Sequence, residues 1–333
     1  MPKTAPARPP VARAAAPDPD RSTVRLALFV GGLVVMLVAG FGLGRVVGQP
    51  AGDSTGGTGT PGGASDHTHA PGTGDHTHPP AAAGGAHDHS TGGPATGPDG
   101  VSGLSLSSAG YTLVPATTQL GVGSAVDFRF TVQGIDRQTV TTFAIVHDKP
   151  LHMIVVRRDL TGYQHLHPTM ASDGTWSVPL ALTGPGIWRA YADFTAVDTA
   201  GTQTPVTLGV DLVANGDYAP TPLPAPAREA SVDGFVVTYE GTPQVGVSQP
   251  LLFRVFRDGS PVAGLERYLG AYGHLVTIRD GDLGYVHVHP EAELAGGGIK
   301  FWMTAPSPGR YRLFLDFQVA GQVHTAEFTL VVG

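Results

Sequence analysis

The sequence predicts an all-β protein in which two tandem Ig-like β-sandwich domains follow a single N-terminal transmembrane helix and a disordered His-rich linker. Three observations support this prediction. Beyond residue 103, short segments alternate apolar and polar side chains and are separated by Gly, Pro, Asp and Asn, which is typical of strands. The second half of this region repeats the pattern of the first half. Ahead of both halves lies one uncharged apolar run at residues 26–44.

The apolar run lies between Arg25 and Arg45, and at 1.5 Å per residue it spans about 28 Å, close to the thickness of one hydrocarbon core. We therefore predict a transmembrane helix over residues 24–46. Basic side chains precede it, so residues 1–23 are expected to form a disordered cytoplasmic tail, with the C-terminal domains outside the cell membrane. A cleaved signal peptide is the alternative, but the run is longer than a usual signal core.

Residues 49–102 are dominated by Gly, Pro, Ala, Ser and Thr, and they contain almost no large apolar side chains. Such a segment cannot bury enough surface to offset its ordering entropy, so it is predicted to be a flexible tether. It carries three histidine pairs: His67 and His69, His76 and His78, and His87 and His89. Tracts of His and Asp bind metals weakly and without strict geometry. A solubilising linker is the alternative.

The two predicted sandwiches occupy residues 103–214 and 228–333, and a Pro-rich linker at residues 217–227 joins them. Residues 126–132 alternate apolar and polar side chains in the first domain, and residues 251–256 do so in the second. Each domain holds about 100 residues of short strands, which suits a sandwich of seven or eight strands.

Composition excludes several functions. Charged residues make up 14% of the chain and the formal net charge is −7, so no nucleic-acid-binding surface is predicted. The chain has no cysteine, which removes disulfides, thiolate metal sites and cysteine nucleophiles. No nucleophile–base pair or phosphate loop is recognisable, so the sequence predicts a binding protein and not an enzyme.

The repeated histidines are the strongest functional signal. Two trios occur at identical spacing: His152, His165 and His167, and again His274, His287 and His289. Side chains two apart on a strand share a face, and the Pro after each trio ends the strand. A turn at residues 159–162 is expected to fold His152 back against the His165/His167 pair, and the second trio to fold likewise. Three converging imidazoles favour Cu(II), Zn(II) or Ni(II).

Three further residues are candidates for the metal sites. Asp193 and Asp316 occupy matched positions in the two repeats and could each supply a fourth ligand or accept a ligand N–H. Pairing of these carboxylates with nearby arginines is the alternative. His147 precedes the first trio and has no counterpart, so it would give the first domain a fourth imidazole.

The segment at residues 148–160, followed by His165-Leu166-His167-Pro168, resembles exported actinobacterial membrane proteins of the heavy-metal-binding type with Ig-like or cupredoxin-like domains. The resemblance covers about residues 140–195 and, more loosely, 265–333. It implies metal handling, of copper in particular, outside the membrane. The second repeat departs from the pattern, because Leu269 stands at the position of His147.

The resulting hypothesis is a single-pass membrane protein whose outward-facing sandwiches bind a divalent metal ion for buffering, resistance or delivery. Copper is preferred, with zinc and nickel as alternatives, and a metal transporter is a possible partner. Two other functions stay open. One is a structural or protein-interaction ectodomain with structural histidines, and the other is a cupin-like metalloenzyme suggested by the spacing of Gly281, His287, His289 and Glu293.

Overall fold

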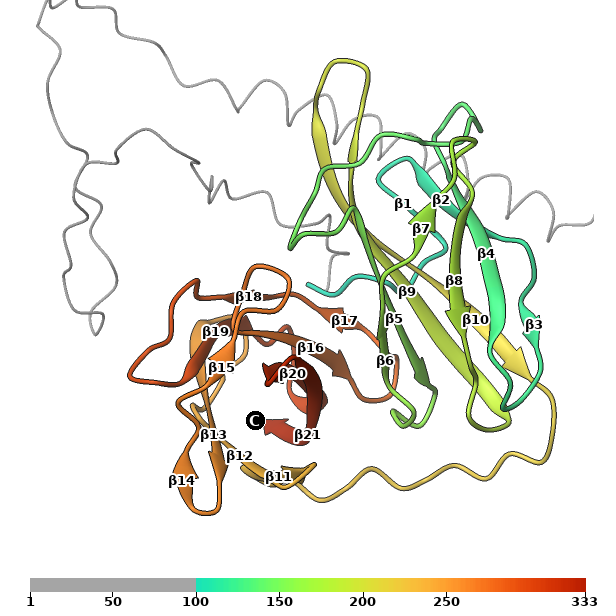
Figure 1. Cartoon of the computed structure of the whole chain (residues 1–333). Helices are drawn as coiled ribbons and strands as arrows, with labels where there is room; N and C mark the ends of the chain where they lie inside the picture. The colour runs from blue at the N-terminus through green and yellow to red at the C-terminus, as the bar shows by residue number, and fades with distance from the viewer. Residues whose placement is uncertain (1–99) are drawn as a thin grey trace, which may run out of the picture. The chain divides into compact units, whose positions relative to one another are not determined.

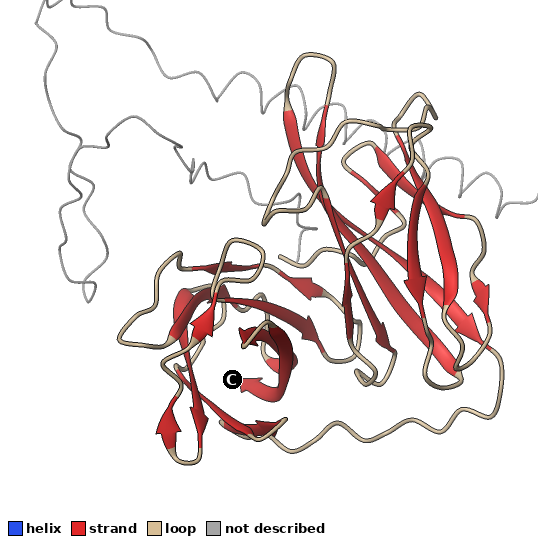
Figure 2. Cartoon of the chain, in the orientation of Figure 1, coloured by secondary structure: helices blue, strands red, loops and turns tan. Residues whose placement is uncertain are grey.

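A computed structural model of the chain describes residues 100–333, and every regular element in this part is a β-strand (Figures 1 and 2). The prediction of an all-β, sandwich-type fold is confirmed for these residues. The predicted tail, the transmembrane helix and the tether up to residue 99, with its three histidine pairs, lie outside the described residues. The last residues assigned to the tether are described: Val101 is buried in the core of the second sandwich and Ser102 pairs with Tyr285. Residues 100–333 contain no helix long and apolar enough to cross a membrane.

The first sandwich consists of two five-stranded sheets. One sheet has the order β1 (Ser107–Ser108), β2 (Tyr111–Pro115), β4 (Val126–Gln133), β8 (Trp176–Leu180), β7 (Thr169–Met170). The other has the order β3 (Gln119–Leu120), β10 (Gln203–Ala214), β9 (Gly186–Val197), β5 (Leu151–Arg157), β6 (Gln164–Leu166). Side chains from both sheets form one core that includes Phe128, Phe130, Trp176, Met153 and Trp188.

The second sandwich has the same plan. Its larger sheet has the order β11 (Glu229–Val232), β12 (Phe235–Glu240), β13 (Ser248–Arg257), β19 (Ile299–Thr304), β18 (Val288–Pro290), and β14 (Ser260–Pro261) pairs with β13. Its other sheet has the order β15 (Leu265–Glu266), β20 (Gly309–Val319), β16 (Gly273–Arg279), β17 (Tyr285–Val286), and β21 (Gln322–Val332) pairs with β20. Phe253, Phe301, Tyr311 and Phe328 lie in its core.

The strands that face solvent on one side show the expected alternation, whereas β5 and β16 do not. In β4, Phe128 and Phe130 are buried while Asp127 and Arg129 are exposed. In β5, all six residues from Leu151 to Val156 are buried, and in β16 the six residues from Gly273 to Ile278 are buried. A strand is buried on both faces only when something covers the outside of its sheet.

The cover is the other sandwich. A third apolar cluster joins the outer face of β5 and β9 to the outer face of β16 and β20, and its buried members are Ile154, Val156, Leu160, Tyr191, Val276, Ile278, Leu283, Tyr285 and Phe314. Tyr163 stacks on Phe314 with ring centroids 4.2 Å apart. The hydroxyl of Tyr191 donates a hydrogen bond of 2.6 Å to the carbonyl of Leu283. The two repeats therefore pack through equivalent faces, and the histidines lie on these faces.

Candidate metal centre

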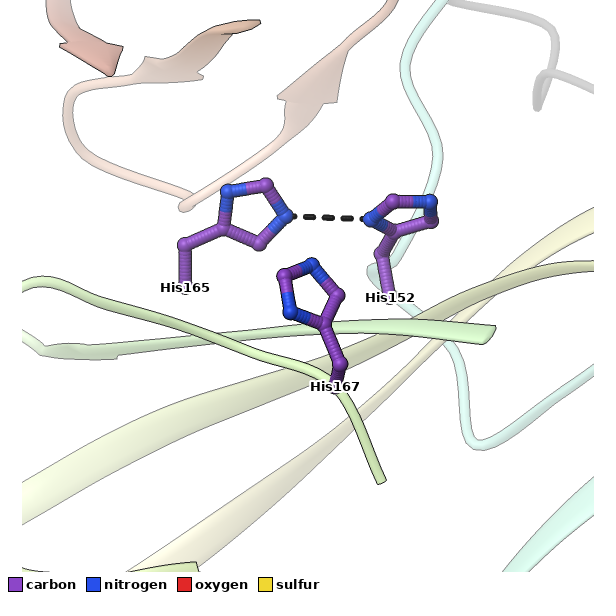
Figure 3. Close-up of side chains that lie close together, drawn as sticks. All are labelled: His152, His165 and His167. Carbon is purple, nitrogen blue, oxygen red and sulfur yellow. Dashed lines mark hydrogen bonds between the residues drawn. The ribbon is translucent and has the colours of Figure 1, made fainter. Parts of the chain in front are cut away.

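The hairpin of β5 and β6 brings the first histidine trio together. Its register pairs Ile154 with His165 and Met153 with Leu166, so His167, just beyond β6, comes level with His152. All three side chains then project from the outer face of the sheet. One ring nitrogen of each lies within 4.8 Å of the others (Figure 3).

Hydrogen bonds fix the tautomers of two of these rings. Nε2 of His152 lies 3.0 Å from the carbonyl oxygen of Val146, which can only accept, so Nε2 carries the proton and Nδ1 the lone pair. Nδ1 of His165 donates to a carboxylate oxygen of Asp316 at 2.8 Å, so in the neutral ring the lone pair lies on Nε2. Nδ1 of His152 and Nε2 of His165 are 3.1 Å apart, within hydrogen-bond distance (Figure 3).

The third ring, His167, has a buried Nε2 without a hydrogen-bond partner. Ring centroids within the trio are 5.3 Å apart for His152 and His165, 5.1 Å for His152 and His167, and 4.8 Å for His165 and His167. Imidazoles that bind one tetrahedral ion through bonds of about 2 Å have centroids roughly 5 Å apart. The trio therefore has the spacing of a three-histidine metal site.

Burial keeps two of these rings, His152 and His167, neutral. Burial and, to a smaller extent, the neighbouring His165 lower the pKa of His152 to about 3 and that of His167 to about 4. A neutral imidazole offers the lone pair that a metal ion needs, so no proton has to be displaced from either ring at neutral pH.

Asp316 comes from β20 in the second sandwich and supports the trio from across the interface. Its carboxylate accepts hydrogen bonds from the hydroxyl of Tyr163 at 3.1 Å and from that of Thr325 at 2.6 Å, besides the bond from His165. The Asp316 side chain is only 3% exposed. A carboxylate that holds the distal N–H of a histidine is the usual support of a metal-ligating imidazole.

The second trio is arranged differently, and within residues 100–333 it does not form a comparable group. His274 in β16 resembles His152, because its Nε2 donates to the carbonyl of Tyr268 at 2.8 Å. Nε2 of His287 lies 3.0 Å from the hydroxyl of Ser102 and 2.9 Å from that of Thr207. His289 lies in β18, which pairs with β19 in the opposite sheet. The predicted convergence of His274, His287 and His289 is therefore not observed.

The remaining candidates lie around the same interface. Asp193 is paired with His152 across β9 and β5, but its carboxylate accepts a hydrogen bond of 2.7 Å from Thr207, the residue that contacts His287. His147 has a φ of +48° at the tip of a tight turn, and its ring centroid is 6.0 Å from that of His152 and 5.2 Å from that of His274.

A cavity of about 190 Å³ adjoins the trio and is lined from both repeats, by His147, His152, His165, Asp193, His274, His287 and His289 among others. It has room for several waters at about 30 Å³ each. Glu293, which the cupin-like alternative needs as a ligand, is exposed and pairs with Arg267 at 2.6 Å.

Four supporting groups were not predicted from the sequence: the hydroxyls of Tyr163 and Thr325 and the carbonyl oxygens of Val146 and Tyr268. Backbone carbonyls leave no mark on a sequence. Tyr163 could have been found, because Tyr285 occupies the matched position in the second repeat.

Similar solved structures include FdeC, an Escherichia coli adhesin, with 15% identity over 69% of this chain and 66% of that chain at a TM-score of 0.23. The bacterial integrin-binding protein invasin shows 14% identity over 68% of this chain and 41% of its own, at a TM-score of 0.21. The D00-D0 domain of intimin shows 12% identity over 66% of this chain and 99% of its own, at a TM-score of 0.20. At such TM-scores the likeness carries no information about function.

A comparison with curated proteins gave no match. A protein family described as a domain of unknown function, DUF8832, matches residues 107–211 and 230–333. These two segments cover the strands of the two sandwiches except for the end of β10 and the first residue of β11, and together they cover more than half of the chain. The chain therefore belongs to the DUF8832 family.

Proposed function

We propose that this protein binds one divalent metal ion through His152, His165 and His167, with copper preferred and zinc or nickel as alternatives. The observation that carries the proposal is that Nδ1 of His152 and Nε2 of His165 face each other at 3.1 Å while the other nitrogen of each ring is held by an oxygen acceptor. In two neutral rings both facing nitrogens carry lone pairs, which repel at this distance, and a cation between them removes the repulsion. The buried, partnerless Nε2 of His167 supplies a third ligand atom.

The donor set favours a site that exchanges its ion. Three protein ligands leave a fourth coordination position open, whereas structural metal sites are usually closed by four protein ligands. The open position faces the cavity shared by the two repeats. This suits buffering, resistance or delivery of a metal ion. In the same proposal, a membrane span at residues 24–46 anchors the protein and the tether histidines raise the local ion concentration.

A structural or protein-interaction role is the second candidate, because this chain also uses buried histidines without any metal geometry. His324 is 5% exposed and pairs with Asp233 at 2.8 Å, and His287 is held by two hydroxyl groups. The β-sandwich architecture is equally suited to a structural or adhesive domain. In that case the first trio is a polar network that fixes the interface between the repeats.

A metal titration of the full-length protein separates the two candidates. The six tether histidines are replaced by alanine in every sample, so that weak binding by the tether does not mask the trio. We expect one equivalent of Cu(II) or Zn(II) to bind, and the double variant His165→Ala/His167→Ala to lose this binding. His289→Ala is the matched control, because it removes an imidazole from the same cavity without touching the trio. Equal uptake by all three proteins would leave only the structural role.

A further inference from the structure

We propose that the second repeat supplies a fourth ligand, His274, so that the metal ion is held across the interface between the two sandwiches. This inference rests on the proposed function of the first trio. It changes the role of the second repeat from a site of its own to part of a single shared centre, and the fourth position is then held by a ligand that leaves when the sandwiches separate.

The ring of His274 is oriented like that of a ligand. Its Nε2 proton is fixed by the carbonyl of Tyr268 at 2.8 Å, so the lone pair resides on Nδ1, as it does in His152. In both repeats the carbonyl belongs to the first residue of a tight turn, which is closed by Val146 and Lys149 in one case and by Tyr268 and Ala271 in the other. His274 is 7% exposed and lines the same cavity as His152 and His165.

The distances place His274 beside the trio, slightly farther out than a bound fourth ligand. Its ring centroid lies 5.9 Å from that of His165 and 6.4 Å from that of His152. Imidazoles around one tetrahedral ion, with bonds of about 2 Å, have centroids roughly 5 Å apart. An inward movement of His274 by about 1 Å therefore completes the coordination sphere.

Other groups of the second repeat differ from His274 in their partners or their position. Nε2 of His287 is held by Ser102 and Thr207, and His289 belongs to a strand of the opposite sheet. The carboxylate of Asp316 already accepts three hydrogen bonds. His274 lies on β16, next to the strand of Asp316, and its hydrogen bond to Tyr268 uses Nε2, which leaves Nδ1 for the ion.

A shared centre links metal binding to the docking of the repeats. Whatever separates the two sandwiches removes His274 from the ion and Asp316 from His165, and so weakens binding. By thermodynamic reciprocity the bound ion strengthens the docking by the same free energy. The stack of Tyr163 on Phe314 and the hydrogen bond from Tyr191 to the carbonyl of Leu283 then act together with the ion.

The test is a count of coordinated nitrogens, with Cu(II) as the probe and the full-length, tether-substituted protein as the sample. Electron paramagnetic resonance of the one-equivalent complex should give four imidazole nitrogens in the parent and three in His274→Ala. The affinity of His274→Ala should fall at least about tenfold, the lower end of the cost of losing a supporting residue. His289→Ala should keep four nitrogens and the parent affinity.

The outcomes distinguish this inference from the proposed function. A parent protein with three nitrogens, together with an unaltered affinity in His274→Ala, overturns the shared centre and leaves the first trio as the site. A parent protein that binds no Cu(II) overturns both. If His274→Ala does not fold, His274→Gln replaces it, because the amide can still donate to the carbonyl of Tyr268. The nitrogen count of the parent protein requires no variant at all.

Discussion

The two repeats carry the same histidine spacing, yet their histidines end in different places. In the first repeat, β6 ends at Leu166 and the next strand begins at Thr169, so His165 and His167 both stay beside β5. In the second, β17 ends at Val286 and β18 begins at Val288, and β18 pairs with the opposite sheet. The chain thus crosses between sheets earlier in the second repeat, which separates His287 from His289.

The segment before the first sandwich adds to this asymmetry. Ser102 pairs with Tyr285 through two backbone hydrogen bonds of 2.9 and 3.0 Å, and Val101 is buried in the core of the second sandwich. Ser102 thereby reaches His287 and occupies its Nε2. In the first repeat, the equivalent side chain His165 meets a carboxylate instead. Equal spacing in the sequence therefore does not guarantee an equal site, because the partners of each histidine come from elsewhere in the chain.

The largest effect we expect concerns the stability of the metal-free protein in acid. It compares His152 and His167 of the first trio with His274 of the second. Burial lowers the pKa of His152 to about 3 and those of His167 and His274 to about 4, against 6.5 for a free histidine. The unfolded chain binds these protons near pH 6.5 and the folded chain does not. The stability they contribute is therefore complete above pH 6.5 and is lost progressively as the pH falls toward 4.

This prediction is measured by denaturant unfolding between pH 7 and 4.5 in the presence of a chelator. His152→Gln/His167→Gln should reduce the slope of unfolding free energy against pH more than His274→Gln, because it removes two of the three groups. Equal slopes in the two variants would mean that His152 and His167 together are not more strongly desolvated than His274 alone.

The next effect is the contrast between His165→Ala and His287→Ala, which remove equivalent imidazoles from the two repeats. Loss of a ligand in the first trio should weaken Cu(II) or Zn(II) binding by more than the roughly 10–100-fold that the loss of a supporting residue costs. His287 is bound to Ser102 and Thr207, so its removal should change the affinity little. Competition titration against a chelator of known affinity measures both. A similar loss in the two variants would show that the second trio also binds metal.

The all-β fold of residues 103–333 could be predicted from alternation alone, because strands such as β4 and β13 are solvated on one face. The convergence of the first trio could be predicted from the spacing of His152, His165 and His167, because the register of one hairpin determines it. The support of His165 by Asp316 could not, since it depends on how two distant sheets meet. A sign of that contact was present, however: residues 151–156 are apolar except for His152, which indicates a strand covered on both faces.

A smaller effect distinguishes the two matched carboxylates. Asp316→Asn keeps the size of the side chain but weakens the acceptor that holds the N–H of His165, so metal affinity should fall by about 10–100-fold. Asp193→Asn should change it much less, because Asp193 accepts its hydrogen bond from Thr207. The readout is metal affinity measured at two pH values. A merely structural change would lower the affinity by the same factor at each pH. An equal response to the two substitutions would contradict the assignment of Asp316 as the positioning residue.

The smallest effect concerns Tyr163, which contacts both the apolar interface and the buried carboxylate. Tyr163→Phe keeps the stack on Phe314 and removes only the hydroxyl that donates to Asp316. Loss of one hydrogen bond to a charged group should lower the unfolding free energy by about 1.5–3 kcal/mol. The control is Tyr285→Phe at the matched position. The hydroxyl of Tyr285 makes no hydrogen bond within residues 100–333. Its removal should therefore lower the unfolding free energy by less than about 0.5 kcal/mol. Denaturant titration in a chelator resolves this difference. If the two phenylalanine variants are equally stable, the Asp316 carboxylate is held adequately by His165 and Thr325 alone, and the asymmetry between the repeats resides in their histidines and not in their tyrosines.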